Sequence, residues 1–167
     1  MKFEEKNGKL IISSFDILDI YKIASKVEKD GIVFYKKLVN KVDDPKTKET
    51  LEFLLKQEDK HLKFFQDCLY KVKETGEDNF EEDDLLGSMD FGVFWPYQNI
   101  EELDKALANT KKAFKLGLAI EDKSIKFYQA CKDNIKDEDI ISELDNIIEE
   151  EKKHKALFES LLEVEKL

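Results

Sequence analysis

Arginine is absent from this chain, because every basic residue among its 167 residues is lysine. The planar guanidinium fork that binds phosphate groups in two places at once is therefore missing. The net charge of −10 would also repel nucleic acid. We expect no nucleic-acid partner.

Proline and glycine are scarce, with 2 and 6 residues, whereas charged residues make up 40% and hydrophobic residues 41% of the chain. This balance is typical of long helices rather than of disordered segments. The length fits one ordinary domain with a substantial core. We expect an all-α protein with a single domain spanning residues 1–167.

A long hydrophobic run is missing near the N-terminus, where the apolar stretch has only four or five residues. Such a stretch is too short for a signal peptide or a membrane span, so we expect a cytoplasmic protein without a membrane partner.

The two cysteines, Cys68 and Cys131, form neither a C-x-x-C pair nor a four-cysteine set. We interpret them as buried thiols rather than as ligands of zinc or of a rubredoxin-type iron centre.

The chain contains an ungapped internal repeat with an offset of 93 residues. The repeat predicts two related halves, near 14–74 and 100–165, joined by a connector at 75–99. It relates acidic, histidine and aromatic positions: Glu28 to Glu121, Phe34-Tyr35 to Phe127-Tyr128, Asp44 to Asp137, Glu58 to Glu151, His61 to His154 and Phe65 to Phe158.

Apolar residues recur at alternating steps of three and four, which predicts four helices near 14–42, 45–74, 100–135 and 138–165. Capping residues support these starts: Asp44 with Pro45, Asn99 with Glu102, and Asp137.

The connector is longer than most bundle loops, which lets the chain cross the bundle before the third helix begins. We therefore predict a ferritin-like four-helix bundle made of two pseudo-symmetric helical hairpins. The connector's apolar part, MDFGVFWPYQN, is expected to pack on the bundle or on a second subunit, and a homodimer is expected.

Each predicted hairpin brings its acidic residues to one level. The turn at Asp43-Asp44-Pro45 lies midway between Glu28 and Glu58, and the turn at Lys136-Asp137 lies midway between Glu121 and Glu151. Each level is about 15 residues from its turn, or roughly 22 Å along a helix. The carboxylates should therefore meet near the middle of the bundle.

Four buried carboxylates would each cost several kcal/mol without cations, and no lysine lies on these helix faces at that level. A Glu and a His three residues apart share a helix face, and carboxylate with imidazole suits iron, manganese or zinc. One Glu from each of two helices and Glu-x-x-His from each of the other two form the constellation of ferritin-like di-iron proteins. The predicted metal ligands are Glu28, Glu58, His61, Glu121, Glu151 and His154, and the predicted cofactor is two iron ions, with manganese or zinc as alternatives.

With this set of residues the chain resembles the rubrerythrin branch of the ferritin-like di-iron carboxylate proteins, over residues 14–165. The resemblance implies that Glu58 and Glu151 bridge the metals, that the glutamates of the first and third helices are terminal ligands, and that each histidine gives one nitrogen. Tyr35 and Tyr128 follow those terminal ligands by seven residues. They are candidates for orienting carboxylates, with core aromatics as the other interpretation.

Two features depart from the rubrerythrin pattern. Full-length rubrerythrins end in a rubredoxin-like domain, and this chain stops after the fourth helix, so electrons would come from a separate donor such as a rubredoxin-like protein. Ser124 stands at a position where rubrerythrins share an additional carboxylate residue. Its replacement concerns their peroxidase chemistry more than their metal binding.

The leading functional hypothesis is a di-iron oxidoreductase that reduces hydrogen peroxide or dioxygen. The first alternative is a ferroxidase or iron-handling protein, and the second, of another class, is a metal-free structural or interaction bundle.

Two other acidic residues near His154, Glu149 and Glu150, are expected to face solvent. We interpret Gly31 and Gly117 as sites of close helix packing.

Overall fold

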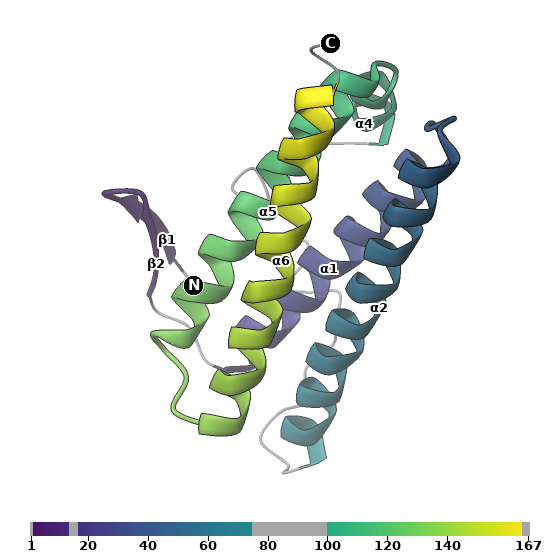
Figure 1. The fold of residues 1–167 in the computed structure, drawn as a ribbon. Coiled ribbons are helices and arrows are strands. Elements are labelled where there is room, and N and C mark those ends of the chain that lie inside the picture. The colour runs from purple at the N-terminus through teal and green to yellow at the C-terminus, as the bar shows by residue number, and fades with distance from the viewer. Residues whose placement is uncertain (1, 14–16, 75–99, 165–167) are drawn as a thin grey trace.

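The computed structural model describes residues 2–13, 17–74 and 100–164. The predicted connector at 75–99, its apolar segment and the predicted cap Asn99 lie outside the described residues. The elements, in chain order, are β1 (Lys2–Lys6), β2 (Lys9–Ser13), α1 (Ile17–Val39), α2 (Pro45–Glu74), α4 (Ile100–Leu107), α5 (Thr110–Lys132) and α6 (Glu138–Val164) (Figure 1).

The four long helices pair as two hairpins. Helix α1 packs along α2, α5 packs along α6, and α1 also contacts α5, so the hairpins lie side by side (Figure 1). The prediction of an all-α, ferritin-like helical bundle is confirmed.

Both hairpin turns fall where the sequence predicts them. The Asp44 carboxylate accepts a hydrogen bond from the backbone N–H of Thr47 at 2.8 Å, with Pro45 as the first residue of α2. The Asp137 carboxylate likewise accepts from the backbone N–H of Ile140 at 3.2 Å, at the start of α6. These caps satisfy N–H groups that have no partner within the helix. They fix the two turns midway between the glutamates of each half.

The third predicted helix is wrong as one continuous helix over 100–135. Helix α4 ends at Leu107 and α5 runs from Thr110 to Lys132. Between them Asn109 has an extended backbone (φ −126, ψ 119), and its side chain accepts from the backbone N–H of Lys112 at 2.9 Å. The break follows because asparagine caps a new helix well.

A two-stranded antiparallel hairpin precedes the bundle, and the sequence analysis did not predict it. Strands β1 and β2 are joined through Asn7 and Gly8, whose φ angles are 54 and 74. Asn-Gly favours this two-residue turn because both residues tolerate positive φ. Strand β2 contacts α5, and Leu10 packs against the core there.

The bundle core consists of two apolar clusters separated along the helices. One, the Ile20 cluster, includes Ile20, Ile23, Phe65, Leu144 and Ile147; the other, the Phe34 cluster, includes Phe34, Leu38, Leu51, Phe114 and Phe158. In each of the four long helices the predicted ligands fall between the residues of these two clusters. The charged layer is therefore covered by apolar side chains at both ends.

Gly117 allows α5 to approach α6 closely. A Cβ atom at this position would lie nearer to the ring of Phe158 than real Cβ contacts allow. We expect Gly117→Ala to lower the free energy of unfolding by about 1–3 kcal/mol, since the core must shift to accept it. Urea denaturation measures this. A gain of about 0.5–1 kcal/mol, as for Gly→Ala in an open helix, would contradict the close contact.

Candidate metal centre

All six predicted ligands are buried in the middle of the bundle, none with more than 4% of its surface exposed. They come from all four long helices: Glu28 from α1, Glu58 and His61 from α2, Glu121 from α5, and Glu151 and His154 from α6. The repeat and the levelled turns thus bring together the residues that the sequence singles out.

The six residues form two overlapping groups, in each of which one ligand atom per residue lies within 4.8 Å of the others. Glu58 and Glu151 belong to both groups. Glu28 and His61 complete the first group, and Glu121 and His154 complete the second. The two shared carboxylates are those to which the rubrerythrin resemblance assigns the bridging role.

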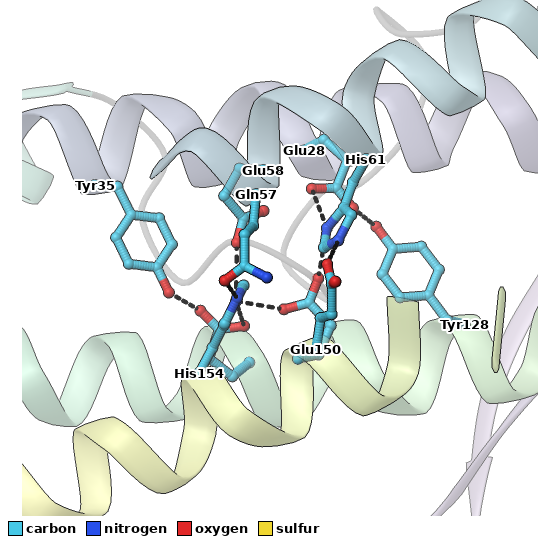
Figure 2. A network of polar contacts seen from close by, with 10 residues as sticks. Glu28, Tyr35, Gln57, Glu58, His61, Tyr128, Glu150 and His154 are labelled. Carbon is cyan, nitrogen blue, oxygen red and sulfur yellow. Dashed lines mark hydrogen bonds and ion pairs between the residues drawn. The ribbon is translucent and has the colours of Figure 1, made fainter. Parts of the chain in front are cut away.

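Both imidazole rings direct Nδ1 at the carboxylates (Figure 2). In His61, Nδ1 lies 3.3 Å from Oε1 of Glu151 and 3.7 Å from Oε2 of Glu28. In His154, Nδ1 lies 3.1 Å from Oε2 of Glu151 and 3.2 Å from Oε1 of Glu58. The two ring centroids are 6.3 Å apart, so both imidazoles serve one centre.

The cluster contains buried polar atoms that lie close to one another but make no hydrogen bond. Six buried side-chain atoms lack a hydrogen-bond partner among the described residues, and five of them belong to the predicted ligands. Buried polar groups are nearly always hydrogen-bonded, so five exceptions at one place need an explanation. Cations would satisfy them, and four carboxylates balance the charge of two divalent ions. The five atoms are Oε2 of Glu28, Oε1 of Glu58, Oε2 of Glu151, and Nδ1 of His61 and of His154.

The far nitrogen of each histidine contacts the opposite hairpin (Figure 2). Nε2 of His61 lies 2.8 Å from Oε2 of Glu150, and Nε2 of His154 lies 3.2 Å from Oε1 of Gln57. A carboxylate only accepts hydrogen bonds, so Nε2 of His61 carries the proton and donates it. The lone pair of the neutral ring is then on Nδ1, which is the tautomer needed for binding a metal at the cluster.

Gln57 and Glu150 were missed as functional residues. Glu150 was expected to face solvent, but its side chain is only 36% exposed and binds His61. Gln57 drew no prediction. The repeat could have found the pair, because the offset of 93 residues relates position 57 to position 150.

The two predicted tyrosines bind Glu121 and Glu28 across the bundle. The hydroxyl of Tyr35 donates to Oε1 of Glu121, and the hydroxyl of Tyr128 donates to Oε1 of Glu28. Each tyrosine therefore orients the glutamate of the other half of the repeat. Both rings are fully buried, so these hydrogen bonds are shielded from water (Figure 2).

Without metal, protons take the place of cations in this cluster. Burial alone would lower the pKa of His61, but the carboxylates of Glu151 and Glu28 raise it to about 12. Burial, followed by the negative charge of Glu151, raises the pKa of Glu121 to about 8 and holds the pKa of Glu58 well above its usual range. The metal-free site thus takes up protons, which offset the negative charge of its buried carboxylates.

A helical bundle with a buried carboxylate and histidine cluster on four helices defines the class of ferritin-like proteins that hold metal between their helices. The rubrerythrin family model matches residues 2–69 of this chain, which include three of the six predicted ligands. Over these residues the chain is similar to rubrerythrins, in agreement with the resemblance seen in its sequence. Neither the comparison with curated proteins nor that with solved structures gave a match.

Among the described residues, no helix combines the length and apolar character needed to cross a membrane.

Proposed function

We propose that this protein is a di-iron oxidoreductase that reduces hydrogen peroxide, or dioxygen, with electrons from a separate rubredoxin-like donor protein. The observation that carries the proposal is the set of five unsatisfied ligand atoms at one buried centre. The rubrerythrin match over residues 2–69 supports iron as the metal. The same cluster argues against a metal-free structural bundle, because burying four carboxylates and two imidazoles together is costly and packing alone does not require it.

The proposed ligands are the six predicted residues, with Glu58 and Glu151 shared between the two metal positions. When bound, two ferrous ions supply the two electrons that convert one hydrogen peroxide and two protons into two water molecules, after which the donor protein returns two electrons.

The protein's own residues hold the centre in place. The hydroxyls of Tyr35 and Tyr128 fix the terminal carboxylates, while Gln57 and Glu150 fix the imidazole rings. The Ile20 and Phe34 clusters cover the layer from both ends and exclude bulk water. The aromatic rings reinforce this cover, since Phe65 and Phe158 stack on the two tyrosines at centroid distances of 5.5 and 6.0 Å.

Ser124 favours iron handling as the second candidate function. The Ser124 side chain is 6% exposed and lies one helical turn after Glu121. Rubrerythrins share an additional carboxylate residue at this position. The repeat relates Ser124 to Gly31, so neither half supplies a carboxylate there. In a ferroxidase, ferrous ion itself would be the substrate, and oxidised iron would leave the site.

Rapid mixing of reduced, iron-loaded protein with peroxide or with dioxygen tests the proposal. We expect peroxide to reoxidise the protein faster than dioxygen, with two electrons consumed per chain. A slow reaction with peroxide and oxidation of many ferrous ions per chain would favour the ferroxidase instead.

The single domain, the homodimer and the cytoplasmic location stay predictions.

Metal binding should strengthen as pH rises. The metal-free site holds protons on groups such as His61 and Glu121, whose pKa values are raised to about 12 and about 8, and metal binding must displace them. The loaded site therefore carries fewer protons, so affinity increases with pH and continues to increase above pH 7. Calorimetric titration in buffers of different ionisation enthalpy measures the protons released. Equal affinity at pH 6 and pH 8 would contradict the protonated metal-free cluster.

A further inference from the structure

The pseudo-symmetry of the metal centre is broken at its outer hydrogen bonds. The repeat matches each proposed ligand with a ligand of the same type, and it matches Tyr35 with Tyr128. At the histidine partners it matches a neutral amide, Gln57, with a carboxylate, Glu150. The two metal positions therefore have like ligands but differ in a charge just outside them.

The difference in charge falls on one histidine only. Glu150 accepts from Nε2 of His61 at 2.8 Å, whereas Gln57 accepts from Nε2 of His154 at 3.2 Å. A hydrogen bond to a charged acceptor is stronger than one to a neutral amide. The carboxylate draws the Nε2 proton toward itself, which makes Nδ1 a better electron-pair donor to a metal ion.

The negative charge of Glu150 also acts through space. Its side chain is 36% exposed, so solvent screens part of this effect, whereas the hydrogen bond itself reaches an imidazole whose side chain is only 4% exposed. The hydrogen bond is therefore the main route by which Glu150 acts on the site. Both effects favour a cation beside His61.

We propose that Glu150 makes the metal position of Glu28 and His61 bind more tightly than the position of Glu121 and His154, so that the protein takes up its two ions in a fixed order. This inference rests on the proposed metal-centre function. Glu150 acts as a positioning residue, because it touches a ligand rather than the metal. Gln57 is its weaker counterpart in the other half.

Titration of the full-length, metal-free protein with Co²⁺ tests the order, followed by calorimetry and visible absorption. We expect two steps that differ in affinity by about 10-fold, the lower end of what a histidine's outer partner contributes. Crystals soaked with less than one equivalent should show higher anomalous occupancy beside His61 than beside His154.

Exchange of the two partners should then rearrange the steps in a defined way. Glu150→Gln should weaken the position of His61, and Gln57→Glu should tighten the position of His154. Each exchange should make the anomalous occupancies beside the two histidines nearly equal. The double variant, with both exchanges, should restore the separation but reverse the occupancies. Glu149→Gln is the matched control, because the neighbouring Glu149 side chain is 63% exposed and pairs with Lys152, not with a histidine. It should leave the separation unchanged.

The outcomes separate the inference from the function on which it rests. Equal occupancies beside the two histidines in the unmodified protein, or an unchanged occupancy ratio in Glu150→Gln, would overturn the order while leaving the metal centre in place. Failure of the unmodified protein to bind Co²⁺ at all would overturn both.

Discussion

Glu58→Gln should reduce metal binding to one ion per chain or none, while making the metal-free protein more stable. Glu58 belongs to both ligand groups, so its loss damages both metal positions. Its Oε1 is buried and makes no hydrogen bond, and burial holds its pKa well above the usual range. An amide needs no proton or cation, so we expect a gain of about 1–3 kcal/mol in the free energy of unfolding without metal.

Metal analysis after iron loading and urea denaturation of the metal-free protein measure the two effects. Glu52→Gln is the matched control, since it removes the same charge from an exposed position on the same helix. The control should bind two ions with stability close to that of the unmodified protein. Two tightly bound ions in Glu58→Gln would refute the shared role of this carboxylate.

Loading with ferrous ion should raise the melting temperature by at least about 10 °C. A ligand present at 1,000 times its dissociation constant adds about 4 kcal/mol per site, and each kcal/mol shifts the melting temperature of a protein of this size by about 2–4 °C. The gain should be large because the ions also relieve repulsion among buried carboxylates. Anaerobic differential scanning calorimetry, with and without a chelator, measures the shift.

Magnesium provides the control for this shift. Mg²⁺ favours oxygen ligands and retains its waters, so a dry site with two imidazoles should bind it poorly. We expect a much smaller rise with Mg²⁺ than with Fe²⁺. Equal melting temperatures with iron and with chelator would mean that the buried cluster does not bind the metal.

The sequence predicts which residues meet in the buried layer because three regularities coincide there. The helical period places Glu28 on a buried face, the turn at Pro45 levels it with Glu58, and the repeat copies both features into the second half. Each regularity concerns one helix or one hairpin, where local chemistry is readable. Because these features agree, the sequence alone predicts that residues from four helices lie in one layer.

The features that the sequence analysis missed depend on competition or on packing between helices. The apolar pattern runs through positions 107 and 110, so the break at Asn109 is visible only in capping chemistry that competes with that pattern. Gln57 and Glu150 lie one residue before the ligands, off the inward face of their own helices. Their contacts arise because α2 and α6 face each other across the site, which the period of a single helix does not reveal.

The central claim is that two cations occupy the buried layer between the Ile20 and Phe34 clusters. An anomalous difference map, recorded at the iron edge from crystals of iron-loaded protein, tests it most directly. We predict two peaks, one beside Nδ1 of His61 and one beside Nδ1 of His154, with Glu58 and Glu151 between them. A map without peaks at these two nitrogens would contradict the claim.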